Sequence, residues 1–103
     1  MDNTLYQSKS QMKRLERQYE QEKFLKEKEI SRIEKEWEDV QIQAASAQSV
    51  LNYMLEQVEA HKDELEADII TKTEEQVSLR RKEIEELLMT GKARYEQQIG
   101  EIK

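Results

Sequence analysis

Carboxylates are the side chains of this chain that could carry acid–base or metal chemistry. Aspartate and glutamate together number 23, against one histidine and no cysteine. Carboxylate catalysis needs a concave, desolvated site that shifts the pKa of the carboxyl group. The sequence contains no Gly-rich phosphate loop, no Ser/His/Asp set and no metal-ligand spacing. We therefore expect a protein that is not an enzyme and that binds no cofactor, no metal and no small-molecule substrate.

Two single residues remain as candidates for a specific role. His61, between Glu59 and Asp63, could sense pH or set the register of a helix pair, although a partly exposed position without a role is the plainer interpretation. Trp37 is the only tryptophan. It either anchors a partner protein, as tryptophan often does at interfaces, or packs the chain on itself.

The elements that would position these residues are helices. Apolar residues recur with alternating steps of three and four, and the stretch from Val40 to Leu55 contains no charged residue, although 39% of the chain is charged. A helix with such a stripe buries it against another helix. We call this stripe the seam and predict that it binds a partner protein. Its members are Ile30, Ile33, Trp37, Val40, Ala44, Ala47, Leu51, Met54 and Val58.

Length and composition predict an all-α protein with no sheet. The chain of 103 residues has no proline, and its two glycines are Gly91 and Gly100. Nothing before Gly91 has to break a helix, and we expect fraying or a kink at that glycine. The composition is typical of a coiled coil. We predict a single domain, 1–103, that is either an elongated helical hairpin or one long coiled-coil helix.

The position of a bend is less strongly indicated. Small residues between Ala44 and Ser49 permit a bend within 42–52, which would divide the chain into arms 4–42 and 53–99. The unbroken spacing through this segment favours a continuous helix equally well. A break in the apolar phase follows near 66–73, where Thr71 and Thr73 fit a capping box. We interpret this break as a coiled-coil stutter, with the start of a second helix as the alternative.

Charge distribution limits the classes of partner. Residues 37–75 carry two basic and ten acidic side chains, and the flanking segments are nearly neutral. Nucleic-acid binding needs clustered lysine and arginine, so we do not expect it. No apolar run is long enough to insert into a membrane, so we expect a cytoplasmic protein, with export alongside a partner left open. Because Ala44 and Ala47 weaken pairing with an identical helix, a helical hetero-partner is favoured over a homodimer.

A charged first arm (Gln11-Met-Lys-Arg-Leu-Glu-Arg-Gln-Tyr-Glu20), the single Trp37 and a second arm (Val77-Ser-Leu-Arg-Arg-Lys-Glu-Ile-Glu-Glu-Leu-Leu88) complete the layout. In size and layout the chain resembles the small α-helical partner proteins of LXG toxins in Gram-positive type VII secretion. The resemblance implies a helical adaptor or chaperone that binds the helical N-terminal domain of a toxin and targets it for export. It places the toxin contact between Trp37 and Val58. The chain lacks a Trp-x-Gly turn and the usual secretion signal, so the partner would supply the export signal.

Two further classes fit the same pattern of charged helices. The chain is similar to the FliJ-type coiled-coil stalk of flagellar and type III export, which is also a charged antiparallel hairpin. A homodimeric coiled-coil spacer is the generic alternative. A stalk of this type would bind an export ATPase ring, and a spacer would form a stable dimer without any other protein.

Overall fold

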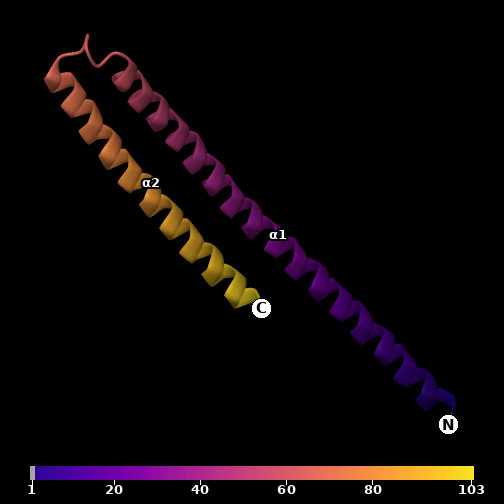
Figure 1. The fold of residues 1–103 in the computed structure, drawn as a ribbon. Coiled ribbons are helices and arrows are strands. Elements are labelled where there is room, and N and C mark those ends of the chain that lie inside the picture. The colour runs from indigo at the N-terminus through magenta and orange to yellow at the C-terminus, as the bar shows by residue number, and fades with distance from the viewer. Residues whose placement is uncertain (1) are drawn as a thin grey trace.

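The chain forms an antiparallel hairpin of two long helices, in a computed structural model that describes residues 2–103 and the side chains from Thr4 onward. Helix α1 spans Asp2–Ala60 and helix α2 spans Ala67–Ile102 (Figure 1). The hairpin measures 95 × 19 × 9 Å, and residues 2–103 contain no strand. The predicted fold class, an all-α elongated helical hairpin, is confirmed.

Helix α1 runs without interruption through the segment where a bend was an alternative. The bend within 42–52, and with it the division into arms 4–42 and 53–99, is wrong, because α1 continues to Ala60. Alanine has the highest helix propensity, and the small residues between Ala44 and Ser49 therefore extend the helix. Across this segment the Gln48 amide donates a hydrogen bond of 3.1 Å to Asn52 Oδ1, one turn further on.

The chain reverses direction between His61 and Glu66, just before the phase break. The amides of Glu64 and Leu65 donate to the His61 carbonyl at 2.9 and 3.0 Å, which closes the turn. Glu66 is the extended N-cap residue of α2, with φ −66° and ψ 146°. The stutter interpretation of the phase break is therefore wrong: the apolar phase changes because the seam of the second helix faces back toward the first.

The threonines near this break do not cap α2. Its first residue is Ala67, so neither Thr71 nor Thr73 begins the helix. The Thr73 hydroxyl donates instead to the Ile69 carbonyl at 2.8 Å, one turn earlier in the same helix. The capping-box pattern thus lies inside a helix, where threonine often satisfies its hydroxyl in this way.

The core of the molecule is the single line of contact between the two helices. Ile33, Ala44 and Leu51 of α1 and Val77 of α2 are buried, with exposed fractions of 2–4%. Apolar residues of α2 form two series with a step of seven residues, one of Ile70, Val77 and Ile84 and one of Leu88, Tyr95 and Ile102. All of them except the buried Val77 are half-buried and lie around the core. A two-helix contact buries one narrow stripe of each helix, which explains why so few residues are fully enclosed.

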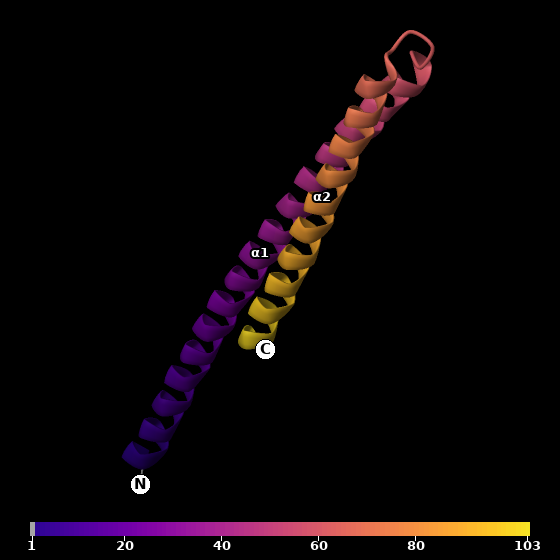
Figure 2. The ribbon, with the colours of Figure 1, turned by 90° about the vertical axis from the view of Figure 1, so that its left-hand side faces the viewer.

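The first part of α1 has no helix beside it. Every side chain from Thr4 to Lys28 is exposed, and α1 extends well past the C-terminal end of α2 in both views (Figures 1 and 2). We call residues 4–28 the free arm and residues 30–103 the paired body. The free arm carries apolar side chains that are each 61–76% exposed, namely Leu5, Tyr6, Met12, Leu15, Tyr19, Phe24 and Leu25.

Candidate functional site: the inter-helix groove and the neutral window of α1

Most of the predicted seam packs against α2 of the same chain. Three of its members, Ile33, Ala44 and Leu51, are buried. Ala47 is exposed at the edge of the contact. The remaining five members are half-buried and are Ile30, Trp37, Val40, Met54 and Val58. The helix against which the seam packs is therefore α2 of the same chain. Binding of the seam to a second protein stays a prediction.

Trp37 stacks on α2 where Gly91 leaves space for its ring. The ring centroids of Trp37 and Tyr95 are 6.2 Å apart and the planes are inclined by 23°. A Cβ atom on Gly91 would lie 2.9 Å from Trp37 Cζ3 and 3.1 Å from Val40 Cγ1, both closer than ordinary contact. These contacts confirm that Trp37 packs the chain on itself. The chain does not fray at Gly91, because α2 continues through this residue to Ile102.

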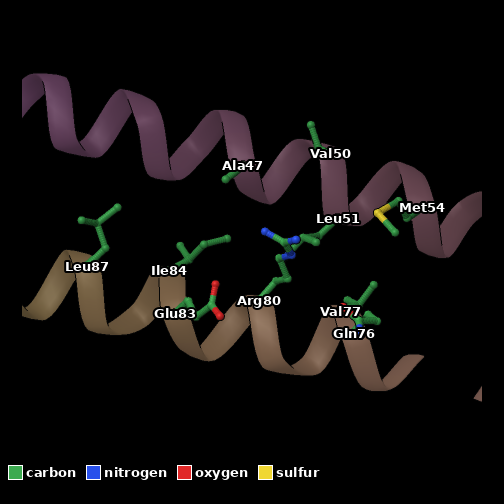
Figure 3. Close-up of a pocket in the computed structure, with 10 residues that line it drawn as sticks. All are labelled: Ala47, Val50, Leu51, Met54, Gln76, Val77, Arg80, Glu83, Ile84 and Leu87. Atoms are coloured by element: carbon green, nitrogen blue, oxygen red, sulfur yellow. The ribbon is translucent and has the colours of Figure 1, made fainter. Parts of the chain in front are cut away.

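A groove of about 620 Å³ runs along one side of the hairpin. Val50 and Met54 of α1 and Leu87 of α2 contribute apolar surface to it, and the side chain of Arg80 extends across the space between the helices (Figure 3). Leu87 also lines a smaller hollow beside Trp37. The two hollows therefore adjoin at this leucine, and we use the word groove for the larger one.

Arg80 stands where α2 lacks an apolar residue. Val77 and Ile84 face α1 on either side of it, and no apolar side chain lies between them on this face. The aliphatic stem of an arginine can cover apolar surface while the guanidinium group stays in water. Arg80 was not predicted from the sequence to be part of the site. Between Val77 and Ile84 the face turned toward α1 has no apolar residue, and this interruption was the signal that could have identified Arg80.

The charge-free segment of α1, residues 40–55, is exposed over most of its circumference. We call it the neutral window. Packing on α2 accounts for its buried and half-buried members, but ten of its residues are exposed and none of them is charged. They are Gln41, Ile42, Gln43, Ala45, Ser46, Ala47, Ser49, Val50, Asn52 and Tyr53. On α2, by contrast, the exposed stretch from Arg80 to Glu83 is fully charged.

His61 does not belong to the packed seam. Helix α1 ends at Ala60, and His61 lies exposed in the turn with its Nδ1 3.0 Å from the Gln57 carbonyl oxygen. The imidazole therefore lies against the last turn of α1. A role in setting the register of the two helices is wrong, and the exposed position is confirmed.

An ion-pair network lies where the paired body begins. Arg32 donates to Glu29 and, at 2.5 Å, to Glu36, so that one guanidinium group links side chains over about two turns of α1. The hydrogen bond from Arg32 holds the pKa of the Glu29 carboxyl below its usual value. The same bond raises the pKa of Arg32. All three side chains are about half exposed, so this network adds little to stability.

The site therefore belongs to an antiparallel helical hairpin with a groove and an uncharged outer face. Among the side chains that the structure describes, those of residues 4–103, no His, Cys, Asp and Glu gather in a group that could hold a metal ion. None of the described helices is both long and apolar enough to cross a membrane. No protein family, curated protein or solved structure matches this chain.

Proposed function

We propose that this protein is a non-catalytic adaptor or chaperone that binds a helix of another protein along the groove and the neutral window. The observation that carries the proposal is the absence of charge on ten exposed residues of α1. In a chain as highly charged as this one, solvent alone gives no reason to keep those positions neutral. Interfaces, in contrast, are depleted of charged residues at their centres.

The groove offers the geometry that a third helix requires. An amphipathic helix lays its apolar face into a hydrophobic groove with anchors at helical spacing. Val50, Met54 and Leu87 would receive those anchors, and the half-buried edge of Trp37 would extend the contact. Adding a third helix would also cover groove residues beside the core, such as Met54 and Ile84, which two helices alone leave half-buried.

The mechanism follows from mass action. A protein that binds only the folded form of its partner stabilises that form in proportion to the logarithm of its free concentration over the dissociation constant. The adaptor would thereby keep apolar helices of the partner covered and hold them in one geometry. By the resemblance described above, the partner is the helical N-terminal domain of an LXG-type toxin, and the complex is directed to type VII secretion.

Val50 provides the test, because it lines the groove and is 59% exposed. We expect Val50→Glu to leave the hairpin intact and to weaken binding of an LXG-domain helical bundle from the same genome at least tenfold in calorimetry. Leu79→Glu is the matched control, since Leu79 is 57% exposed on α2 and lies away from the groove. Equal affinity of both variants would refute the assignment of the groove. Leu51 cannot serve here, because it is only 4% exposed and Leu51→Glu would disrupt the hairpin itself.

A FliJ-like stalk in a type III or flagellar export apparatus is the second candidate, favoured by the antiparallel hairpin and its unequal helices of 59 and 36 residues. This function would require binding to an export ATPase ring. Co-sedimentation with an assembled ring, and no binding to the toxin domain, would replace the adaptor proposal with this one.

A further inference from the structure

The free arm continues the helix-packing face of α1 beyond α2. The residues of the free arm on this face are spaced by alternating steps of three and four residues. They are Leu5, Ser8, Met12, Leu15, Tyr19, Glu22 and Lys26. A step of four joins Lys26 to Ile30, the first apolar residue of the paired body. The stripe of Leu5, Met12, Leu15 and Tyr19 is therefore continuous with the α1–α2 interface, but its side chains are 61–68% exposed.

We propose that the free arm pairs with the free arm of a second copy of this chain, in antiparallel orientation. In an antiparallel pair, the residue numbers of two facing core residues always add up to the same value. Each core layer joins an a position of one helix to a d position of the other. With Met12 opposite Leu15 of the second copy, Ser8 comes opposite Tyr19 of the second copy. By two-fold symmetry each layer occurs twice, so that two Met–Leu layers are flanked by two layers that match a large side chain with a small one. Outside these, two further layers oppose Leu5 to Glu22 of the second copy, so that no two like charges meet in the core.

The charges beside this core select the same register. In antiparallel coiled coils, residues at equivalent flanking positions face each other across the core. On one flank Lys9 meets Glu16 of the second copy, and Glu16 meets Lys9 of the second copy. On the other flank Gln11 and Gln18 are uncharged. A shift of one heptad in either direction would oppose Lys9 to Lys23, or Lys9 to itself, so that like charges would meet.

Parallel pairing of the arms is disfavoured by the same residues. It would place Glu22 on Glu22 and Lys26 on Lys26 within the core, where like charges repel. It would also bring both paired bodies to the same end. Residues 1–29 carry seven basic and six acidic side chains, a net charge of +1, whereas residues 30–103 carry ten basic and seventeen acidic ones, a net charge of −7. Antiparallel arms hold the two acidic bodies at opposite ends of the rod.

A charge-swap series tests this pairing. We expect the full chain to form a dimer in sedimentation equilibrium, and Lys9→Glu to raise its dissociation constant roughly tenfold, because both symmetry-related pairs become repulsive. The double variant Lys9→Glu/Glu16→Lys should restore the original value. Lys13→Glu is the matched control, with the same change of charge at an exposed position outside the core and flanks. A monomer at all concentrations, or equal effects of the two single variants, would overturn the proposal.

Orientation is tested separately, because the chain has no cysteine. A mixture of Met12→Cys and Leu15→Cys chains should form a disulfide-linked dimer on mild oxidation, since these positions share a layer. Leu5→Cys alone should not, because the two copies of this residue would lie about 26 Å apart along the axis. Efficient linkage of Leu5→Cys would indicate parallel arms and overturn the proposal. This dimer is joined through the free arms and leaves the groove open, so its formation does not by itself indicate a spacer. Its failure would likewise leave the groove assignment untouched.

Discussion

The contact between Trp37 and Gly91 makes a prediction that runs against ordinary helix propensity. Replacing glycine by alanine inside a helix normally stabilises it by about 1 kcal/mol. At position 91 the new methyl group would lie 2.9 Å from Trp37 Cζ3. Moving a ring in a packed contact costs roughly 1–3 kcal/mol. We therefore expect Gly91→Ala to lower the free energy of unfolding by about 1 kcal/mol, the difference between the two effects.

Gly100 provides the matched control within the same helix. No atom lies within 4 Å of the position that its Cβ would occupy. Gly100→Ala should therefore raise the free energy of unfolding by a few tenths of a kcal/mol up to about 1 kcal/mol, reduced by its place in the last turns of α2. Urea unfolding followed by circular dichroism measures both changes, and Gly91→Ala should also shift the melting temperature down by about 5 °C.

A second background isolates the steric contact. In a Trp37→Leu chain the ring atoms that crowd position 91 are gone and Val40 Cγ1 remains, at 3.1 Å, so Gly91→Ala should there be stabilising by up to about 1 kcal/mol. The coupling free energy between the two positions would then be up to about 2 kcal/mol. Because Trp37 is the only tryptophan, its fluorescence should also shift to longer wavelength in Gly91→Ala as the ring moves outward. If Gly91→Ala stabilises the wild-type chain as much as Gly100→Ala does, the close packing of Trp37 on α2 is refuted.

Two further predictions concern the core and the ion-pair network. Ile33→Ala should destabilise the hairpin by about 3 kcal/mol because Ile33 is 2% exposed, whereas Ile42→Ala, at 56% exposure, should change urea unfolding little; similar losses for both would contradict the assigned packing face. Arg32→Gln should raise the pKa of Glu29 back toward its usual value in an NMR titration, since the hydrogen bond from Arg32 lowers it. The lowered pKa means that this pair stabilises the helix above the unfolded pKa and that its contribution disappears as the pH falls through the folded pKa; an unchanged pKa would show that the pair does not form.

The helical class could be predicted from composition and spacing, whereas the position of the turn could not. A six-residue turn without proline or glycine has no strong local signature, and here it consists of His61-Lys-Asp-Glu-Leu-Glu66. The segment Ala44–Ser49 looked more suited to a bend because its side chains are small. Helix propensity favours a continuous helix in that segment. The position of the turn is set by the pairing of two segments distant in the sequence rather than by local preference.

The phase break near 66–73 was the one feature of the sequence that lay beside the turn. Within one long coiled coil a stutter keeps the apolar residues on a single, slightly displaced face. In a hairpin the two seams belong to different helices and need no common phase, because each is set independently by the face it turns toward the other. The series of Ile70, Val77 and Ile84 could therefore be out of register with the first seam at no energetic cost. A break followed by a regular second seam of similar apolar content favours a hairpin over a stutter.

The site itself was only partly predictable, because one apolar stripe cannot reveal which helix covers it. Trp37 was identified from the sequence, but its neighbours Gly91 and Tyr95 lie more than fifty residues away and meet it only through the fold. Because the apolar stripe of α1 packs on α2, only the exposed side of the neutral window can indicate a partner protein. On that side Ile42, Val50 and Tyr53 are 56–61% exposed. Intramolecular packing explains the apolar seam and leaves those neutral, exposed residues unexplained. Any account of what this protein binds therefore has to begin from the outer face of α1 rather than from its core.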